Sequence, residues 1–156
     1  MATQTNLLAN ANVAEIELRY LPKRNVSSLP QITCSADSYA LFLKSWDMDR
    51  LHLVEQFKMI LLNRANRVLG IIELSTGGGT GTIADSRIIF AAALIANATS
   101  IIVSHNHPSG NLKPSRADIE LTRKLREGGK LLDVAVLDHI IVTGHAYYSF
   151  ADEGVI

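Results

Sequence analysis

The stretch that decides the fold runs from Ser100 to Asp118 and reads SIIVSHNHPSGNLKPSRAD. It opens with a short apolar run, rich in β-branched residues, that is typical of a buried strand. Two histidines, His105 and His107, stand at the end of that run. Side chains two positions apart on a strand point to the same side, so we expect both imidazoles to leave the strand together and to face one point.

A helix start follows this strand and adds a carboxylate. Ser115 and Asp118 have the spacing of a helix N-terminus, with the serine as cap and the aspartate in the first turn. Taken alone, this pair indicates only a cap, and His-x-His alone is a weak metal signal. Together, the strand end, the tight turn and the helix start bring His105, His107 and Asp118 to one place. Two His and one Asp are the ligand set of a catalytic zinc site with one position left to water, and Mn or Fe can also occupy such a set.

The same residues resemble a known family. The pattern His-x-His, seven residues, Ser, two residues, Asp is similar to the motif of the JAB/MPN (JAMM) metalloproteases, and the string Ser104–Gly110 together with Asp138 and His139 resembles the RadC branch. The resemblance covers roughly residues 35–153. It implies an α/β domain with a curved mixed β-sheet flanked by helices, a cytidine-deaminase-like architecture.

The resemblance also carries expectations about function. Members of the superfamily are usually zinc hydrolases that cleave peptide or isopeptide bonds, whereas RadC proteins were named for DNA repair. Longer members carry a helix-hairpin-helix module before the domain. The chain has about 35 residues before the matching part, too few for that module, so we expect a short form.

A zinc hydrolase also needs a general acid/base, and two glutamates are candidates. If the hairpin turns near residues 64–65, Glu55 lies opposite residue 74 or 75, which brings Glu55 and Glu73 to the same end of the sheet. This reasoning leaves both open. The resemblance favours Glu55, because the family's base precedes a strand in a Glu-x-Phe-apolar context that EQFKMILL, residues 55–62, matches. It also implies that Ser115 stabilises the tetrahedral oxyanion, a donor role that is compatible with accepting a bond in the cap.

Other polar residues are open to two interpretations. Asp138 and His139 either support a metal-bound imidazole from behind or form a buried polar pair that the backbone satisfies. His52 and His145 fall in predicted loop or helix-end positions, so we expect them on the surface. The glycine-rich segment 77–81 lacks the Lys-Ser/Thr ending of a P-loop, and we interpret it as a linker rather than a flap.

Hydrophobic periodicity and turn signals predict the remaining elements. We expect strands over 13–20, 57–62, 67–74, 101–104, 131–142 and 146–150, and helices over 36–46, 85–97 and 115–126, the last ending at Gly128 and Gly129. Residues 21–34 are expected to be irregular. We expect residues 13–156 to form a single domain and residues 1–12 to form a disordered polar tail.

Composition narrows the function further. The formal net charge is +0, so no bulk charge attracts the chain to nucleic acid or to anionic membrane. A single cysteine, Cys34, excludes an intrachain disulfide and fits a reducing compartment. The N-terminal residues lack signal-peptide features, and the apolar stretch 88–103 is too short and polar to span a bilayer. We therefore expect a cytoplasmic protein that acts on a peptide or protein substrate; the oligomeric state stays open.

Two other classes compete with the hydrolase. Residues 111–130 hold six Lys or Arg against three Asp or Glu, an excess of three positive charges, which favours a nucleic-acid-binding module linked to DNA repair and without proteolysis. No aromatic platform accompanies these charges. The third class is an inactive scaffold, which the intact ligand set argues against.

Overall fold

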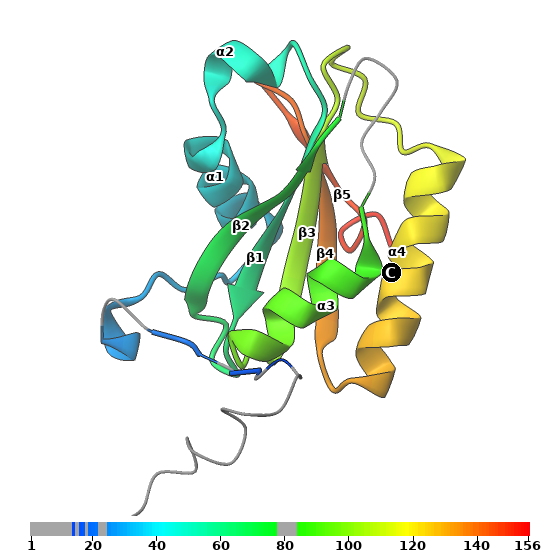
Figure 1. The fold of residues 1–156 in the computed structure, drawn as a ribbon. Helices are drawn as coiled ribbons and strands as arrows, with labels where there is room; N and C mark the ends of the chain where they lie inside the picture. The colour runs from blue at the N-terminus through cyan, green and yellow to red at the C-terminus, as the bar shows by residue number, and fades with distance from the viewer. Residues whose placement is uncertain (1–13, 15, 18, 22–24, 78–83) are drawn as a thin grey trace, which may run out of the picture.

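One mixed β-sheet forms the centre of the molecule and helices lie on both of its faces (Figure 1). The computed structural model describes residues 14, 16–17, 19–21, 25–77 and 84–156. The strand order is β2-β1-β3-β4-β5, with β1 at Gln56–Leu62, β2 at Val68–Thr76, β3 at Ser100–Asn106, β4 at Ala135–Val142 and β5 at Tyr147–Ser149. The predicted α/β class, a mixed sheet flanked by helices, is confirmed.

The sheet is antiparallel except at one pair of strands. β1 pairs antiparallel with β2 and with β3, β4 pairs antiparallel with β5, and β3 and β4 are parallel. A parallel pair needs a crossover, and the helix α4, Arg116–Leu131, supplies it. The other helices are α1 at Ser35–Ser45, the short α2 at Met48–Leu51 and α3 at Ser86–Ile95, and a 3₁₀ turn, η2, spans Val26–Ser28. Among the described residues, no helix has both the length and the apolar character needed to cross a membrane.

Each face of the sheet packs against its own apolar cluster. The central strands β1 and β3 are buried along their whole length, which explains their nearly continuous apolar sequence. On one face, side chains of β1 and β3 pack against α3 and α4; this cluster includes Phe57, Met59, Ile101, Val103, Ile89, Phe90 and Leu125. On the other face, the sheet packs against α1; this cluster includes Ile60, Leu62, Ile102, Ile140, Phe42 and Trp46.

Helix α4 does not end at Gly128 and Gly129, as the sequence predicted, but continues through both to Leu131. These glycines serve close packing. A Cβ at Gly129 would lie 2.2 Å from the carbonyl oxygen of Val134, and one at Gly128 would lie 2.9 Å from the ring of Phe90. The chain turns only after the helix, where Asp133 adopts a φ of 54°. The predicted strand over 131–142 accordingly begins four residues later, at Ala135.

The predicted strand over 13–20 is wrong for the residues that the structure describes there. Residues 14, 16, 17, 19 and 20 are exposed and belong to no strand. The alternation of apolar and polar residues did not suffice to form a strand here, because no strand of the described sheet pairs with this segment. The predicted tail, residues 1–12, lies outside the described residues, and so does most of the glycine-rich segment. The other predicted helices and strands occur with ends shifted by one or two residues, and the short helix α2 was not predicted.

Two bulges in the β1–β2 hairpin change the register that the sequence predicted. Leu62 pairs with Val68, but register shifts after Leu61 and Phe57 each add one residue to β2. The backbone N–H of Gly77 therefore donates to the carbonyl of Glu55 at 2.8 Å. Glu55 lies opposite residue 77 rather than residue 74 or 75.

Candidate metal centre

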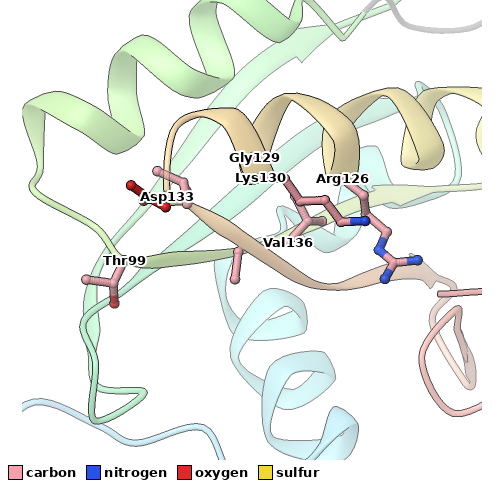
Figure 2. Close-up of a pocket in the computed structure, with 8 residues that line it drawn as sticks. Thr99, Arg126, Gly129, Lys130, Asp133 and Val136 are labelled. Atoms are coloured by element: carbon pink, nitrogen blue, oxygen red, sulfur yellow. The ribbon is translucent and has the colours of Figure 1, made fainter.

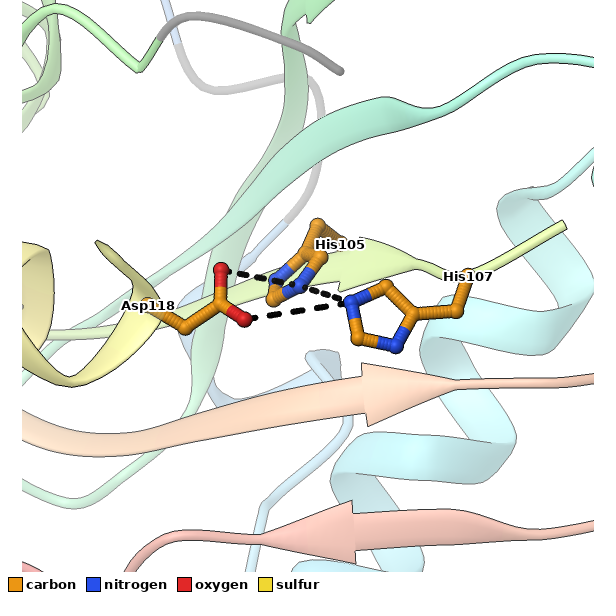
Figure 3. A group of neighbouring side chains, drawn as sticks. All are labelled: His105, His107 and Asp118. Carbon is orange, nitrogen blue, oxygen red and sulfur yellow. Dashed lines mark hydrogen bonds and ion pairs between the residues drawn. The ribbon is translucent and has the colours of Figure 1, made fainter. Parts of the chain in front are cut away.

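The end of β3 and the first turn of α4 bring three ligand side chains together (Figure 3). His105 lies in β3, His107 follows the strand directly, and Asp118 points back toward both from α4. One ligand atom from each lies within 4.8 Å of the other two. In the part of the chain that the structure describes, this is the one group of three such side chains that can hold a metal ion. The structure therefore brings together the three predicted ligands.

The spacing of the ligand atoms fits one small ion. The Nε2 atom of His105 lies 3.4 Å from Oδ1 of Asp118 and 2.9 Å from Nε2 of His107, and the latter lies 3.9 Å from Oδ2 of Asp118. Tetrahedral ligands at zinc distances of about 2.0–2.2 Å lie roughly 3.4 Å apart. The observed separations lie on both sides of that value, so the donor set fits zinc.

The hydrogen bond between His107 and Asn111 determines which ring nitrogen of His107 carries the proton and which one carries the lone pair. Nδ1 of His107 lies 2.5 Å from the carbonyl oxygen of Asn111. A carbonyl only accepts, so Nδ1 carries the proton and donates it. In the neutral ring, Nε2 then presents its lone pair to His105 and Asp118. A lone pair and a carboxylate at this distance repel each other, and a cation between them replaces that repulsion with attraction to both.

A capping box holds the carboxylate of Asp118 in place. The backbone N–H of Ser115 donates to Oδ2 of Asp118 at 2.7 Å, and the backbone N–H of Asp118 donates to Oγ of Ser115 at 3.1 Å. Ser115 is thus the helix cap that the sequence predicted, and it acts there as an acceptor. Its hydroxyl proton is not used by this cap.

His105 is the most enclosed of the three ligands, with 1% of its surface exposed. Burial lowers its pKa to about 4, although the carboxylate of Asp118 opposes this change. The ring of Phe57 lies parallel to the imidazole, with centroids 6.2 Å apart. Behind it, Nδ1 of His105 lies 2.8 Å from Nε2 of His139. His105 is therefore a neutral ring with both nitrogens engaged in polar contacts.

The predicted pair Asp138 and His139 divides between the two faces of the sheet. His139 is fully buried beside His105, and burial lowers its pKa well below the usual value. Asp138 points the other way, where it accepts from the hydroxyl of Ser149 at 2.6 Å and the N–H of Ala151 at 3.0 Å; burial raises its pKa. Of this pair, only His139 thus contacts a candidate metal ligand, His105. His52 and His145 are exposed, as predicted.

Asn106, which the sequence analysis missed, connects the metal ligands to the segment that carries Glu55. It stands between the two histidines and faces the other side of β3, fully buried. Its Oδ1 accepts from the N–H of Gln56 at 2.7 Å, and its Nδ2 donates to the carbonyls of Leu51 at 2.7 Å and Val54 at 2.9 Å. The two peptide groups that flank Glu55 are therefore both held by one side chain from the metal-binding strand.

The two candidate glutamates have different surroundings. Glu55 stands just before β1 and two positions before Phe57, whose ring packs on His105, so the strand period predicts Glu55 on the face of the three candidate ligands. Glu73 pairs with Lys58 at 3.6 Å, and Lys58 donates to the carbonyl of Ser45 in α1 on the other face. A hydrogen bond from Thr76 holds the pKa of Glu73 below its usual range. Glu73 is thus directed away from the ligands.

A pocket of about 450 Å³ lies near the other end of α4 and does not touch the metal ligands (Figure 2). Arg126 and Lys130 of α4 point along it, and Asp133 stands at its far side. Its charged side chains are exposed, and they include one carboxylate and no histidine. Of these two places, the N-terminal end of α4, around Asp118, is the one that gathers three possible metal ligands.

Comparison with known proteins identifies a family and several relatives that are similar to this chain. Residues 32–155 match the RadC-like JAB domain. The chain is 42% identical to a UPF0758 protein of Flavobacterium johnsoniae over 92% of its own length and 62% of the relative's. It is 40% identical to a UPF0758 protein of Salinibacter ruber, over 81% of this chain and 53% of that protein. The chain thus spans between half and two thirds of the length of these relatives.

Proposed function

Because this chain belongs to the RadC-like JAB domain family, we propose that it is a zinc-dependent hydrolase of peptide or isopeptide bonds. The observation that carries the proposal is the convergence of His105, His107 and Asp118, with the proton of His107 held on the far side of its ring by the carbonyl of Asn111. Three donor atoms that face one point with two lone pairs and a negative charge form a cation site.

The donor set favours zinc, and Mn or Fe are the alternatives that the same ligands accept. When bound, zinc lowers the pKa of a water molecule toward about 7 and so supplies a nucleophile for hydrolysis at neutral pH. The protein's part is to hold the ligands. β3 fixes the two imidazoles, and the capping box fixes the carboxylate of Asp118.

We assign Glu55 as the general acid/base. Its carboxylate takes a proton from the attacking water and returns it to the leaving amine nitrogen. Two observations support the choice of Glu55 over Glu73: Asn106 holds both peptide groups that flank Glu55, and Glu73 is engaged by Lys58 and Thr76. The strand period also predicts Glu55 on the face of the three candidate ligands.

We assign Ser115 the role of oxyanion donor. Its oxygen accepts from the N–H of Asp118, a bond that does not use its hydroxyl proton. One such donor contributes about 3–4 kcal/mol to transition-state stabilisation. The same residue therefore caps the helix that carries a metal ligand and serves the reacting carbonyl.

The basic face of α4 gives less support to a nucleic-acid-binding function. Arg116 pairs with Glu120 at 3.1 Å and Arg123 pairs with Glu127 at 3.0 Å, both along the helix. These pairs reduce the positive surface that a phosphate backbone would meet. A substrate that contains an amide bond therefore remains the proposed partner.

The test is hydrolysis by the zinc-loaded chain of a mixed peptide library that includes lysine isopeptides, read by mass spectrometry. Glu55→Gln should keep zinc and fold but lower the cleavage rate by about 10²-fold or more, the range of a general acid/base. Glu73→Gln is the matched control and should keep most of the rate. Equal losses in both variants, or a larger loss in Glu73→Gln, would refute the assignment of Glu55. A zinc-loaded wild-type chain that cleaves no amide in the library would refute the hydrolase.

A further inference from the structure

A line of buried polar contacts runs from the back of His105 into helix α4. Nδ1 of His105 lies 2.8 Å from Nε2 of His139, and Nδ1 of His139 lies 2.7 Å from Oγ1 of Thr122. The hydroxyl of Thr122 donates in turn to the carbonyl oxygen of Asp118 at 2.6 Å. His105 is 1% exposed, and His139 and Thr122 are fully buried. The line therefore begins at one metal ligand and ends on the backbone of another.

The end of this line fixes the position of every proton along it. The carbonyl of Asp118 only accepts, so it takes the single hydroxyl proton of Thr122. The oxygen of Thr122 must then accept from Nδ1–H of His139. A neutral His139 has its lone pair on Nε2, which accepts from Nδ1–H of His105. A neutral His105 is left with its lone pair on Nε2, the atom that faces His107 and Asp118.

We propose that His139 and Thr122 are positioning residues that fix His105 in the Nδ1–H tautomer, so that Nε2 is ready to bind the ion before the ion arrives. This inference rests on the proposed metal site, because the tautomer has a use only if Nε2 is a ligand. The opposite tautomer would set two lone pairs against each other 2.8 Å apart in a buried place. His107 reaches the same state through the carbonyl of Asn111.

Aromatic packing supports this arrangement by holding the rings in place. The ring of Phe150 stacks on His139 with centroids 4.6 Å apart, and Phe57 lies parallel to His105. A flipped His139 would put Cδ2 and Cε1 where Nδ1 and Nε2 now lie and would break both contacts of the line. Thr122 is therefore the member of the line that is best suited to substitution, because its hydroxyl can be removed without changing the packed rings.

The first experiment reads the tautomer directly in metal-free protein. Long-range ¹H–¹⁵N NMR spectra of the ¹⁵N-histidine-labelled chain at pH 8 should show His105 and His139 as Nδ1–H tautomers. An Nε2–H tautomer at His105 would overturn the proposal. This measurement needs neither zinc nor a substrate, so it is decided separately from the hydrolase function and from zinc binding itself.

The second experiment measures zinc affinity by competition with a chelator. Thr122→Val keeps the shape but removes the hydroxyl, and it should weaken zinc binding about 10- to 100-fold, the usual range for a residue behind a ligand. Thr122→Ser restores the hydroxyl and should bind zinc within about threefold of wild type. Thr143→Val is the matched control, because Thr143 is a buried threonine whose hydroxyl donates to the carbonyl of Ala146 instead.

The variants distinguish a positioning role from a merely structural one. Thr143→Val should lose stability and keep zinc affinity, whereas Thr122→Val should lose zinc affinity and regain it on replacement by serine. Wild-type affinity in a folded Thr122→Val protein, or equal losses in the valine and serine variants, would overturn the role of Thr122. Failure of the wild-type chain to bind zinc would instead refute the metal site on which the inference rests.

Discussion

Asn106 shows how much of the site depends on one side chain outside the ligand set. It occupies the position between His105 and His107, and it holds the peptide groups on both sides of Glu55. The two histidines face one side of β3 and Asn106 faces the other. Asn106 therefore connects the end of β3, where the two histidines lie, to the segment that carries Glu55.

Asn106→Ala removes three hydrogen bonds, two of them buried and one partly buried, and should lower the free energy of unfolding by about 2–4 kcal/mol, because the partners are left unpaired. Zinc affinity should change little, since the side chain of Asn106 bonds to Leu51, Val54 and Gln56 on the other face of β3. The cleavage rate of the folded fraction should fall at least tenfold, because Glu55 loses its fixed position. Ser104→Ala is the control on the same strand face, since its buried hydroxyl donates to the carbonyl of Ile140. A cleavage rate equal to that of the Ser104→Ala protein would contradict the positioning of Glu55 by Asn106.

The spacing of residues along the chain predicted the members of the candidate site that are close in sequence. It missed the members that the fold brings in from distant positions. The strand period placed His105 and His107 on one side, and the cap pattern placed Asp118 in the first turn of α4. The same period should have separated Asp138 from His139, since neighbours on a strand point to opposite faces. Thr122 gave no local signal, because its partner His139 lies 17 positions away.

At the level of elements, the two glycines of α4 are places where the helix closely approaches its neighbours, Phe90 of α3 at Gly128 and the turn into β4 at Gly129. Gly129→Ala would set a Cβ 2.2 Å from the carbonyl of Val134, so the turn into β4 must shift. We expect a net loss of about 2 kcal/mol in the free energy of unfolding, since overpacking outweighs the gain of about 1 kcal/mol in helix propensity. Urea denaturation measures it.

Gly128→Ala is the matched control for this change. Its Cβ would meet the edge of the Phe90 ring at 2.9 Å, and a side chain can move where a backbone carbonyl cannot. We expect a free energy of unfolding within about 1 kcal/mol of wild type. A Gly129→Ala protein as stable as the Gly128→Ala protein would show that the contact with Val134 does not set the end of the helix.

Element types were more predictable than their ends. Most helices and strands followed from apolar periodicity and from caps such as Asp85 and Ser115. The end of α4 was not predicted correctly, because Gly128 and Gly129 were interpreted as a stop signal. Gly129 is instead required by the packing against Val134. The strand predicted over 13–20 failed in the described residues, since alternation indicates a strand only where a neighbouring strand offers backbone partners.

At the scale of the whole molecule, the buried histidines make the stability of the metal-free protein depend on pH. Burial lowers the pKa of His105 to about 4 and that of His139 well below its usual value, whereas both titrate near 6.5 when unfolded. Below pH 6.5 the unfolded chain binds protons that the native state does not. The stability contribution is therefore fully present above pH 6.5 and is lost as the pH falls toward the lowered values.

Between pH 7.0 and 5.5 we expect the metal-free protein to lose on the order of 2 kcal/mol of stability from these two groups together. Urea denaturation in the presence of a chelator at a series of pH values gives the measurement. His139→Gln should show a flatter dependence, because one of the two titrating groups is gone. A dependence of the same steepness in that variant would indicate that other groups govern the acid limb.

Calorimetric titration of zinc into metal-free protein at pH 7.5, with elemental analysis of the product, measures whether His105, His107 and Asp118 hold one zinc ion. We predict about one zinc per chain for wild type and for His145→Ala, which changes an exposed histidine outside the site. The His105→Ala/His107→Ala double variant should bind none at that site. A folded wild-type chain that takes up no zinc, or a double variant that binds zinc as tightly as wild type, would contradict the account.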